Sequence, residues 1–217
     1  MAEVVLVVVA CGLLVTLLMA EKSKSTAWIL AFKAPLSALF LVAALIQQHP
    51  LQSYYHWVLA GLAAGLIGDV CLALKGNRAF RAGLVAFLLG HVLYIVAFAG
   101  LTRPADWSSL GLVFIVAVSL GVFWWLRPHL GAMMIPVVFY IIAISLMLAA
   151  AWIAFLNPEL RWTGAWAVLV GAACFYASDL FVARDRFVES QFINRLLGLP
   201  LYYVGQFLIA FSVGLVR

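Results

Sequence analysis

Charged residues are scarce in this chain, with 13 basic and 8 acidic side chains among 217 residues. A soluble domain averages about 25% charged and about 45–50% apolar residues, whereas 67% of this chain is hydrophobic. A water-soluble globule of this size cannot cover so much apolar surface, so the composition excludes a soluble enzyme, a disordered chain and a nucleic-acid-binding domain. The net charge of +5 is then expected to set the orientation in a membrane rather than to attract an anionic partner.

Cysteine and familiar catalytic motifs are also scarce. The three cysteines, Cys11, Cys71 and Cys174, form no CxxC pair and lie in apolar stretches, so we interpret them as small buried hydrophobic side chains. The sequence contains no G-x-S-x-G, no Walker loop and no G-x-G-x-x-G. No second ligand stands at metal spacing beside His91, and the other three histidines lie in or near loops. We therefore expect no metal site.

Long apolar runs dominate the sequence instead. A membrane-spanning helix needs roughly 20 mostly apolar residues. The first run has no basic region before it and no A-x-A-like site after it, so we interpret it as a retained helix rather than a cleaved signal peptide. Short loops leave no room for a soluble domain, which predicts a single all-α domain over residues 1–217 with any chemistry inside the bundle or at its rim. The eight predicted spans are 3–20, 26–47, 55–75, 80–101, 108–126, 131–155, 162–184 and 195–215.

Basic residues predict the orientation of the bundle. Three of them, Arg103, Arg161 and Arg217, lie on one side, and nine lie in the loops on the other side. The positive-inside rule places the nine in the cytoplasm, so we expect both termini on the non-cytoplasmic side of a bacterial-type inner membrane. The nine are Lys22, Lys24, Lys75, Arg78, Arg81, Arg127, Arg184, Arg186 and Arg195.

A faint internal repeat relates the two halves of the chain. The pentapeptide Gly-His-Val-Leu-Tyr at 90–94 resembles Gly-Leu-Pro-Leu-Tyr at 198–202, and Asp69 corresponds to Asp179. Four helices in each half would make two parallel repeats, with corresponding helices pointing the same way. Chance similarity between apolar helices is the alternative.

Three charged residues lie well inside predicted spans, away from the span ends: Lys33, Asp69 and Asp179. A charge at the bilayer centre costs between about 2.5 and more than 10 kcal/mol, so such residues face the bundle interior and need partners. At about 1.5 Å per helical residue, the distance to the nearest cytoplasmic basic residue is about 9 Å for Asp69, about 7–8 Å for Asp179 and about 13 Å for Lys33. The three side chains can therefore meet in one layer. One shared proton would bring their summed charge to zero, leaving one acid protonated and one ionised, as general acid and base catalysis requires. The alternative is an ion pair that only fixes helix register.

Polar side chains on other spans can join this layer. His91 and Tyr94 lie one turn apart on one face. Tyr140 follows Pro136, which predicts a kink beside a hydroxyl group. Together with these, a stripe of Tyr202, Tyr203 and Gln206 would line a polar pocket that opens to the cytoplasmic leaflet, although each residue alone is more typical of contacts between membrane helices.

The order of these motifs resembles the YhhN family, which includes the TMEM86 lysoplasmalogenases. The resemblance runs through nearly the whole chain, and its motifs are Lys-Ala-Pro at 33–35, Gly-Asp at 68–69, Gly-His at 90–91 with Tyr94, Ser-Asp at 178–179 with Arg-Phe at 186–187, and Tyr-Tyr at 202–203 with Gln206. It implies an eight-helix membrane hydrolase that cleaves the vinyl-ether bond of lysoplasmalogens, with Asp69 and Asp179 as the key acids.

On this hypothesis the reaction needs a lysophospholipid, water and the surrounding membrane lipids, and no metal or organic cofactor. An aspartic acid protonates the alkene carbon, and the other carboxylate stabilises the resulting cation and activates water. Lys33, Arg78 or Arg186 would hold the lipid phosphate. The alternatives are a proton-coupled membrane transporter of a small molecule or lipid and a structural membrane subunit.

Overall fold

Eight long helices account for most of the chain. The computed structural model describes residues 1–103 and 110–217, and within them the fold is all-α, without strands. All eight helices are long and apolar enough to cross a membrane, which confirms the predicted spans. The first two residues of the span predicted at 108–126 lie outside the described residues. The helices are α1 (Ala2–Ser23), α2 (Thr26–Leu45), α3 (Gln52–Ala73), α4 (Asn77–Ala99), α5 (Leu110–Leu126), α6 (Met134–Phe155), α7 (Trp162–Ala183) and α8 (Phe192–Leu215).

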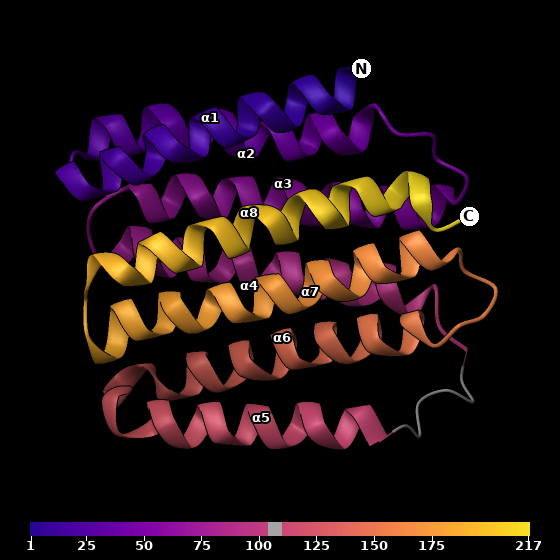
Figure 1. The fold of residues 1–217 in the computed structure, drawn as a ribbon. Coiled ribbons are helices and arrows are strands. Elements are labelled where there is room, and N and C mark those ends of the chain that lie inside the picture. The colour runs from indigo at the N-terminus through magenta and orange to yellow at the C-terminus, as the bar shows by residue number, and fades with distance from the viewer. Residues whose placement is uncertain (104–109) are drawn as a thin grey trace.

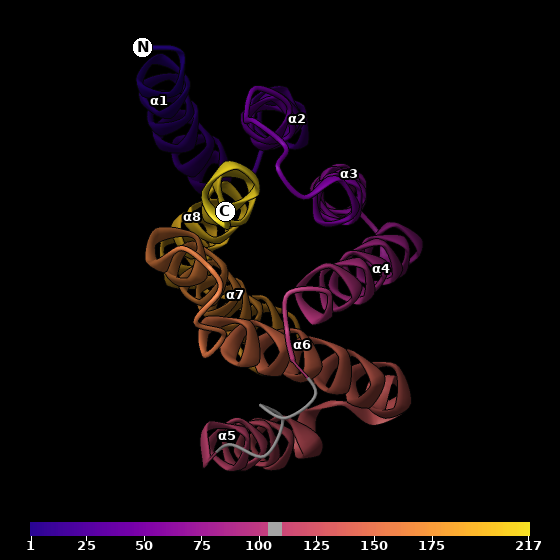
Figure 2. The ribbon, with the colours of Figure 1, turned by 90° about the vertical axis from the view of Figure 1, so that its right-hand side faces the viewer.

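Six helices form a ring and two lie outside it (Figures 1 and 2). Neighbours in the ring are α2 and α3, α3 and α4, α4 and α6, α6 and α7, α7 and α8, and finally α8 and α2. Helix α1 packs outside against α2 and α8, and α5 packs outside against α6. The outer position of α1 and α5, which are equivalent under the predicted repeat, agrees with two four-helix halves related in a parallel sense.

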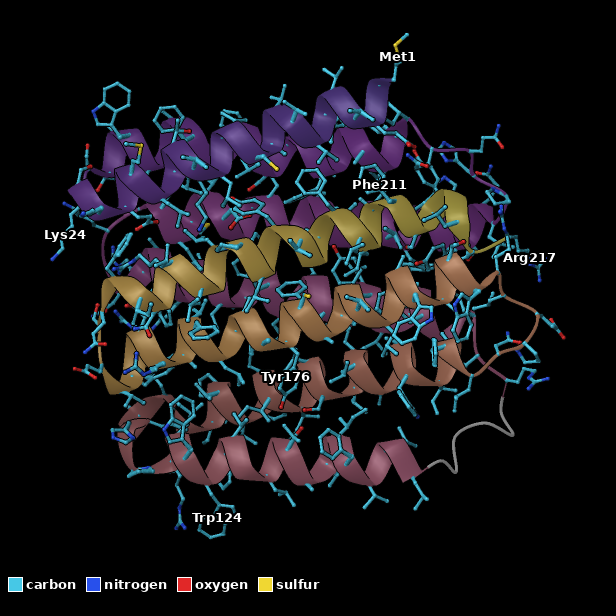
Figure 3. The ribbon with its side chains drawn as sticks, viewed as in Figure 1. Met1, Lys24, Trp124, Tyr176, Phe211 and Arg217 are labelled. Carbon is cyan, nitrogen blue, oxygen red and sulfur yellow. The ribbon has the colours of Figure 1, made fainter. Side chains whose placement is uncertain are left out.

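The two ends of the bundle differ in charge. Both chain termini lie at one end, and the turns after α1, α3, α5 and α7 lie at the other (Figure 1). Lys24 marks the end with the nine basic residues, whereas Met1 and Arg217 lie at the opposite end (Figure 3). Because the nine basic residues occur at alternate turns, they lie together at one end of the bundle, as the sequence pattern predicts, and the direction across the membrane stays a prediction.

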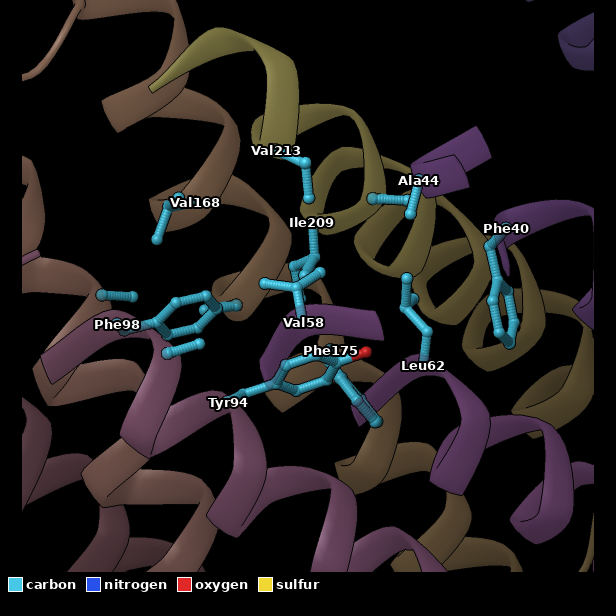
Figure 4. Close-up of a cluster of buried hydrophobic side chains, with 14 of the residues drawn as sticks. Phe40, Ala44, Val58, Leu62, Tyr94, Phe98, Val168, Phe175, Ile209 and Val213 are labelled. Atoms are coloured by element: carbon cyan, nitrogen blue, oxygen red, sulfur yellow. The ribbon is translucent and has the colours of Figure 1, made fainter. Parts of the chain in front are cut away.

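The core lies where the ring helices meet. Phe40 of α2, Leu62 of α3, Phe175 of α7 and Ile209 of α8 are fully buried and converge in Figure 4. Large apolar side chains such as Trp124 point outward from the bundle (Figure 3), as expected where the surroundings are lipid.

Two local predictions were wrong. Cys11 is exposed, because it lies on α1 at the outer edge of the bundle, and Cys71 and Cys174 are only half-buried. Pro136 lies in the first turn of α6, where a missing backbone N–H breaks no helical hydrogen bond, so the kink expected there has no cause. The prolines that do lie inside helices are Pro35 in α2 and Pro200 in α8.

Candidate active site

Asp69 lies on α3 and is 1% exposed. Its Oδ1 atom is 3.1 Å from Nζ of Lys33 on α2. Its Oδ2 atom accepts hydrogen bonds from Ser37 Oγ at 2.7 Å and from the Tyr202 hydroxyl at 2.6 Å. A buried carboxylate with a cation and two hydroxyl donors has the partners that an ionised acid needs away from water. The lysine and the two hydroxyl donors favour the charged form of Asp69, against the desolvation that burial imposes.

A second layer of side chains supports these donors. Ser37 gives its only proton to Asp69, so the Tyr203 hydroxyl, at 3.1 Å, must donate to Ser37 Oγ. Gln206 Nε2 donates to the Tyr202 hydroxyl at 3.2 Å, and the Tyr94 hydroxyl donates to Gln206 Oε1 at 2.7 Å. All of these groups are buried, so the predicted residues Tyr94, Tyr203 and Gln206 form a satisfied network behind Asp69.

Glycine on α3 makes room for this network. A methyl group at Gly65 would lie 2.8 Å from Gln206 Nε2 and 3.3 Å from the Tyr202 hydroxyl. At Gly61 it would lie 2.5 Å from the Tyr94 ring. Small residues four apart on a membrane helix allow neighbouring helices this close approach. The Gly61–Gly65 spacing thus sets how near Tyr94, Tyr202 and Gln206 come to α3.

Asp179 lies on α7, and 14% of its side chain is exposed. Its Oδ2 atom accepts a hydrogen bond from the Tyr140 hydroxyl at 2.8 Å and lies 3.2 Å from His91 Nε2. His91 is fully buried, and its Nδ1 atom lies 2.7 Å from the backbone oxygen of Phe87. The aromatic rings of Tyr140 and Phe175 pack against the imidazole. The side chain of Asp179 is thus more accessible than that of Asp69, and within the described residues no lysine or arginine forms an ion pair with it.

The hydrogen bonds of His91 fix the position of a proton. A backbone oxygen can only accept, so Nδ1 must carry a hydrogen and donate to Phe87. In a neutral imidazole Nε2 would then be an acceptor, and it faces Oδ2 of Asp179, which is an acceptor too when ionised. Their 3.2 Å contact is a hydrogen bond only if a proton lies between them. The His91–Asp179 pair therefore holds one exchangeable proton.

One cavity connects the two acids. It has a volume of about 310 Å³, and its walls include Lys33, Asp69, Tyr140, Asp179 and Tyr202. Most other lining side chains are apolar, and the mouth reaches the basic end of the bundle at Arg186 and Arg195. The predicted residues His91, Tyr94, Tyr203 and Gln206 are not part of the cavity wall. His91 contacts Asp179 in the wall directly, and Tyr203 reaches Asp69 in the wall through Ser37. Tyr94 bonds to Gln206, which bonds to Tyr202 in the wall.

Ser37 is a site residue that the sequence pattern did not reveal. It lies one turn after Lys33, so the two side chains share a face of α2, and this spacing beside a buried lysine is the signal that could have found it. Among the described residues, no three His, Cys, Asp or Glu side chains are grouped to hold a metal ion. The polar groups that contact Asp69 and Asp179 are thus a lysine, a histidine and the hydroxyl groups of Ser37, Tyr140 and Tyr202.

The fold and the site together define a class: a multi-pass membrane protein in which a buried acid, Asp69, and a partly buried acid, Asp179, share a largely apolar cavity. The chain matches the YhhN family over residues 28–213 and belongs to that family.

Relatives named lysoplasmalogenase align with most of the chain. It is 37% identical over 179 residues to a lysoplasmalogenase of Mycobacterium bovis, an alignment that covers 80% of this chain and 64% of that protein. It is 33% identical over 158 residues to lysoplasmalogenase TMEM86A of Bos taurus, covering 71% and 64%. It is also 32% identical over 208 residues to lysoplasmalogenase TMEM86B of Rattus norvegicus, covering 94% and 81%. The chain thus spans 64% of the length of the mycobacterial and bovine relatives, and no solved structure shows a significant match.

Proposed function

We propose that this chain is a membrane-embedded hydrolase that cleaves the vinyl-ether bond of a lysoplasmalogen. The products are a fatty aldehyde and glycerophospho-ethanolamine or glycerophospho-choline. The observation that carries the proposal is the unequal pair of acids at one cavity: Asp69 paired with a lysine, and Asp179 sharing a proton with His91. Relatives named lysoplasmalogenase support it.

The first step of this mechanism is transfer of the shared proton. The His91–Asp179 pair protonates the alkene carbon that is beta to the ether oxygen, and the double bond becomes an oxocarbenium ion. Positioned proton transfer of this kind contributes about 10²–10⁴-fold to rate. Tyr140 keeps Asp179 oriented toward the cavity through its hydrogen bond. The apolar walls accept the hydrocarbon chain and exclude most water.

Addition of water completes the reaction. Ionised Asp69 stabilises the cation across the cavity while water attacks the oxocarbenium carbon. The attacking water gives up a proton, and this proton replaces the one that the His91–Asp179 pair lost. The resulting hemiacetal collapses to an aldehyde and the alcohol of the glycerol backbone. One water is consumed and no electron is transferred, so the proposed reaction requires no oxidant or reductant.

Release of fatty aldehyde from an alkenyl lysophospholipid by purified protein in detergent tests this function. We expect turnover by the wild-type protein and a loss of about 100-fold or more in Asp179→Asn and in Asp69→Asn. Elution of each variant as a monodisperse folded protein controls for misfolding. Aldehyde release by the double Asn variant at the wild-type rate would contradict the proposal.

A proton-coupled carrier is the second candidate function, and the proton held between His91 and Asp179 is the observation that favours it. A carrier has no measurable activity without two compartments. Turnover in detergent therefore supports the hydrolase, whereas substrate-dependent proton uptake into proteoliposomes without aldehyde release supports the carrier.

We also propose that the basic end of the bundle faces the cytoplasm of a bacterial-type inner membrane, with both termini outside. The asymmetry of basic residues between the two ends supports this orientation. Labelling of a cysteine placed at Lys24 by a membrane-impermeant maleimide, compared with one placed at Arg217, tests it in intact cells. We expect labelling at position 217 alone, and labelling at position 24 alone would reverse the orientation.

A further inference from the structure

Three cations line the cavity, and two of them already have carboxylate partners. Lys33 pairs with Asp69 deep in the bundle. Arg195 lies at the mouth, where its Nε atom is 3.1 Å from Glu21 and a terminal nitrogen is 2.9 Å from Asp185. Both acids at the mouth are therefore bound to one guanidinium. Neither Lys33 nor Arg195 is free to take an anionic ligand without losing an ion pair.

Arg186 is different. Its guanidinium donates a 2.7 Å hydrogen bond to Oδ1 of Asn77 and lies over the ring of Phe80, 4.2 Å from its centre. Within the part of the chain that the structure describes, no carboxylate is within ion-pair distance of it. A neutral amide and an aromatic face fix the direction of the guanidinium but leave its charge unneutralised.

The local backbone also sets Arg186 apart. It lies in a π-helical turn, Arg184–Val188, that continues α7, and such turns occur frequently at functional sites. Phe187 from the same turn packs edge-on against Phe80, so the turn is held against the start of α4. Arg186 follows Asp179 by seven residues, which is two turns and about 10 Å along the helix. The same helix therefore carries one acid deep in the cavity and one unpaired cation at its mouth.

We propose that Arg186, oriented by Asn77 and Phe80, binds the phosphodiester of the lipid substrate. This inference rests on the proposed function and names the part of the site that recognises the head group. Arginine donates two parallel hydrogen bonds to phosphate oxygens, and these charge-assisted bonds are stronger than neutral ones. In a lysoplasmalogen the glycerol backbone separates the phosphate from the vinyl ether by a few bonds. Phosphate bound at Arg186 therefore places the vinyl ether toward Asp179.

The test compares a lipid with phosphate and one without. The kcat/KM of the purified protein is measured for an alkenyl lysophospholipid and for the matching alkenyl glycerol. We expect Arg186→Gln to lower the preference for the phospholipid by about 10- to 100-fold, chiefly through KM, and Arg186→Lys to restore part of it. Arg81→Gln is the matched control, because Arg81 is exposed at the same end of the bundle but does not line the cavity, and it should keep the wild-type preference. An unchanged preference in Arg186→Gln would overturn the inference, as would an equal loss for both lipids.

Direct binding separates this inference from the proposed reaction. A plain-ether lysophospholipid contains no vinyl ether, so its affinity for the protein can be measured without turnover. We expect Arg186→Gln to weaken its binding by about 10-fold or more and Arg81→Gln to have no effect. If the wild-type protein releases no aldehyde but Arg186→Gln still weakens lysophospholipid binding, the proposed reaction is refuted and the phosphate site is supported. Wild-type affinity in Arg186→Gln would refute the site.

Inorganic phosphate distinguishes the source of the ligand. If Arg186 recognises a phosphodiester carried by a lipid, inorganic phosphate displaces the plain-ether lysophospholipid only at concentrations far above that of the lipid. Displacement at equal concentrations would mean that the site takes free phosphate, and would overturn the assignment to the lipid head group.

Discussion

Asp69 and Asp179 occupy equivalent places in the two halves of the bundle, yet their surroundings differ. Asp69 is closed off, ion-paired to Lys33 and bonded to two hydroxyl groups. Asp179 is partly open to the cavity and shares a proton with His91. Two residues of one type therefore acquire different chemistry from their neighbours: the first is held ionised, and the second is supplied with a proton to donate.

The helices that contact the two acids follow the same pattern, although the contacting residues differ. Asp69 on α3 is bonded from α2, the preceding helix in its own half, and from α8, the last helix of the other half. Asp179 on α7 is bonded from α6, which precedes it, and from α4, the last helix of the first half. The last helix of each half thus contributes a side chain that contacts the acid of the other half.

The largest expected effect on stability comes from separating the ion pair at Asp69. Lys33→Met leaves a buried carboxylate without its cation, and breaking a buried pair costs about 3–5 kcal/mol. The double variant Lys33→Met, Asp69→Asn removes both charges and should recover much of that loss. Thermal unfolding in detergent measures both. A single variant as stable as the wild type would mean that Asp69 does not depend on Lys33 for its charge.

The corresponding change beside Asp179 replaces His91, the residue that shares a proton with it. His91→Phe keeps a ring of similar size against Phe175 but takes away the bond to Asp179, so we expect turnover to fall by about 10- to 100-fold with a smaller loss of stability. Nitrogen NMR of histidine-labelled wild-type protein should show a proton on Nδ1 of His91. A neutral imidazole protonated at Nε2 alone would contradict the hydrogen-bond assignment.

A smaller effect is expected where α3 approaches α8. Gly65→Ala puts a methyl group too close to Gln206 Nε2, and overpacking of this kind costs about 1–3 kcal/mol. Because Gln206 bonds to Tyr202, turnover should fall as well. Gly121→Ala on α5 is the matched control, since nothing lies within 4 Å of the added carbon. Equal thermal stability of the two variants would show that the close approach is unimportant.

The smallest expected effect concerns Ser37. Ser37→Ala removes one of two hydroxyl donors to Asp69 and leaves Lys33 and Tyr202 in place, so we expect a loss of about 0.5–1.5 kcal/mol in stability. Ser37→Thr keeps the hydroxyl and should retain more stability. If the alanine variant loses as much stability as Lys33→Met, the hydroxyl and not the lysine is the main partner of Asp69.

Much of the fold follows from the sequence, because apolar length and sparse charge are local signals. The eight spans and the three charged residues that lie deep within them, Lys33, Asp69 and Asp179, could be predicted in this way. Which helices are neighbours could not, since similar apolar faces do not specify partners. The contact between His91 and Asp179 therefore had no local signal, and neither did the position of Tyr94 and Tyr203 behind the cavity wall rather than in it.

The division of roles between the two acids is tested most directly by a single-turnover measurement. Wild-type, Asp179→Asn and Asp69→Asn proteins are mixed with an alkenyl lysophospholipid in deuterated and in ordinary water, and aldehyde release is followed. The account predicts a slower reaction in deuterated water for the wild-type protein and for the residual activity of Asp69→Asn, because each still transfers the proton held by His91 and Asp179. It also predicts that Asp179→Asn loses this transfer. A wild-type rate and isotope effect in Asp179→Asn would contradict the account.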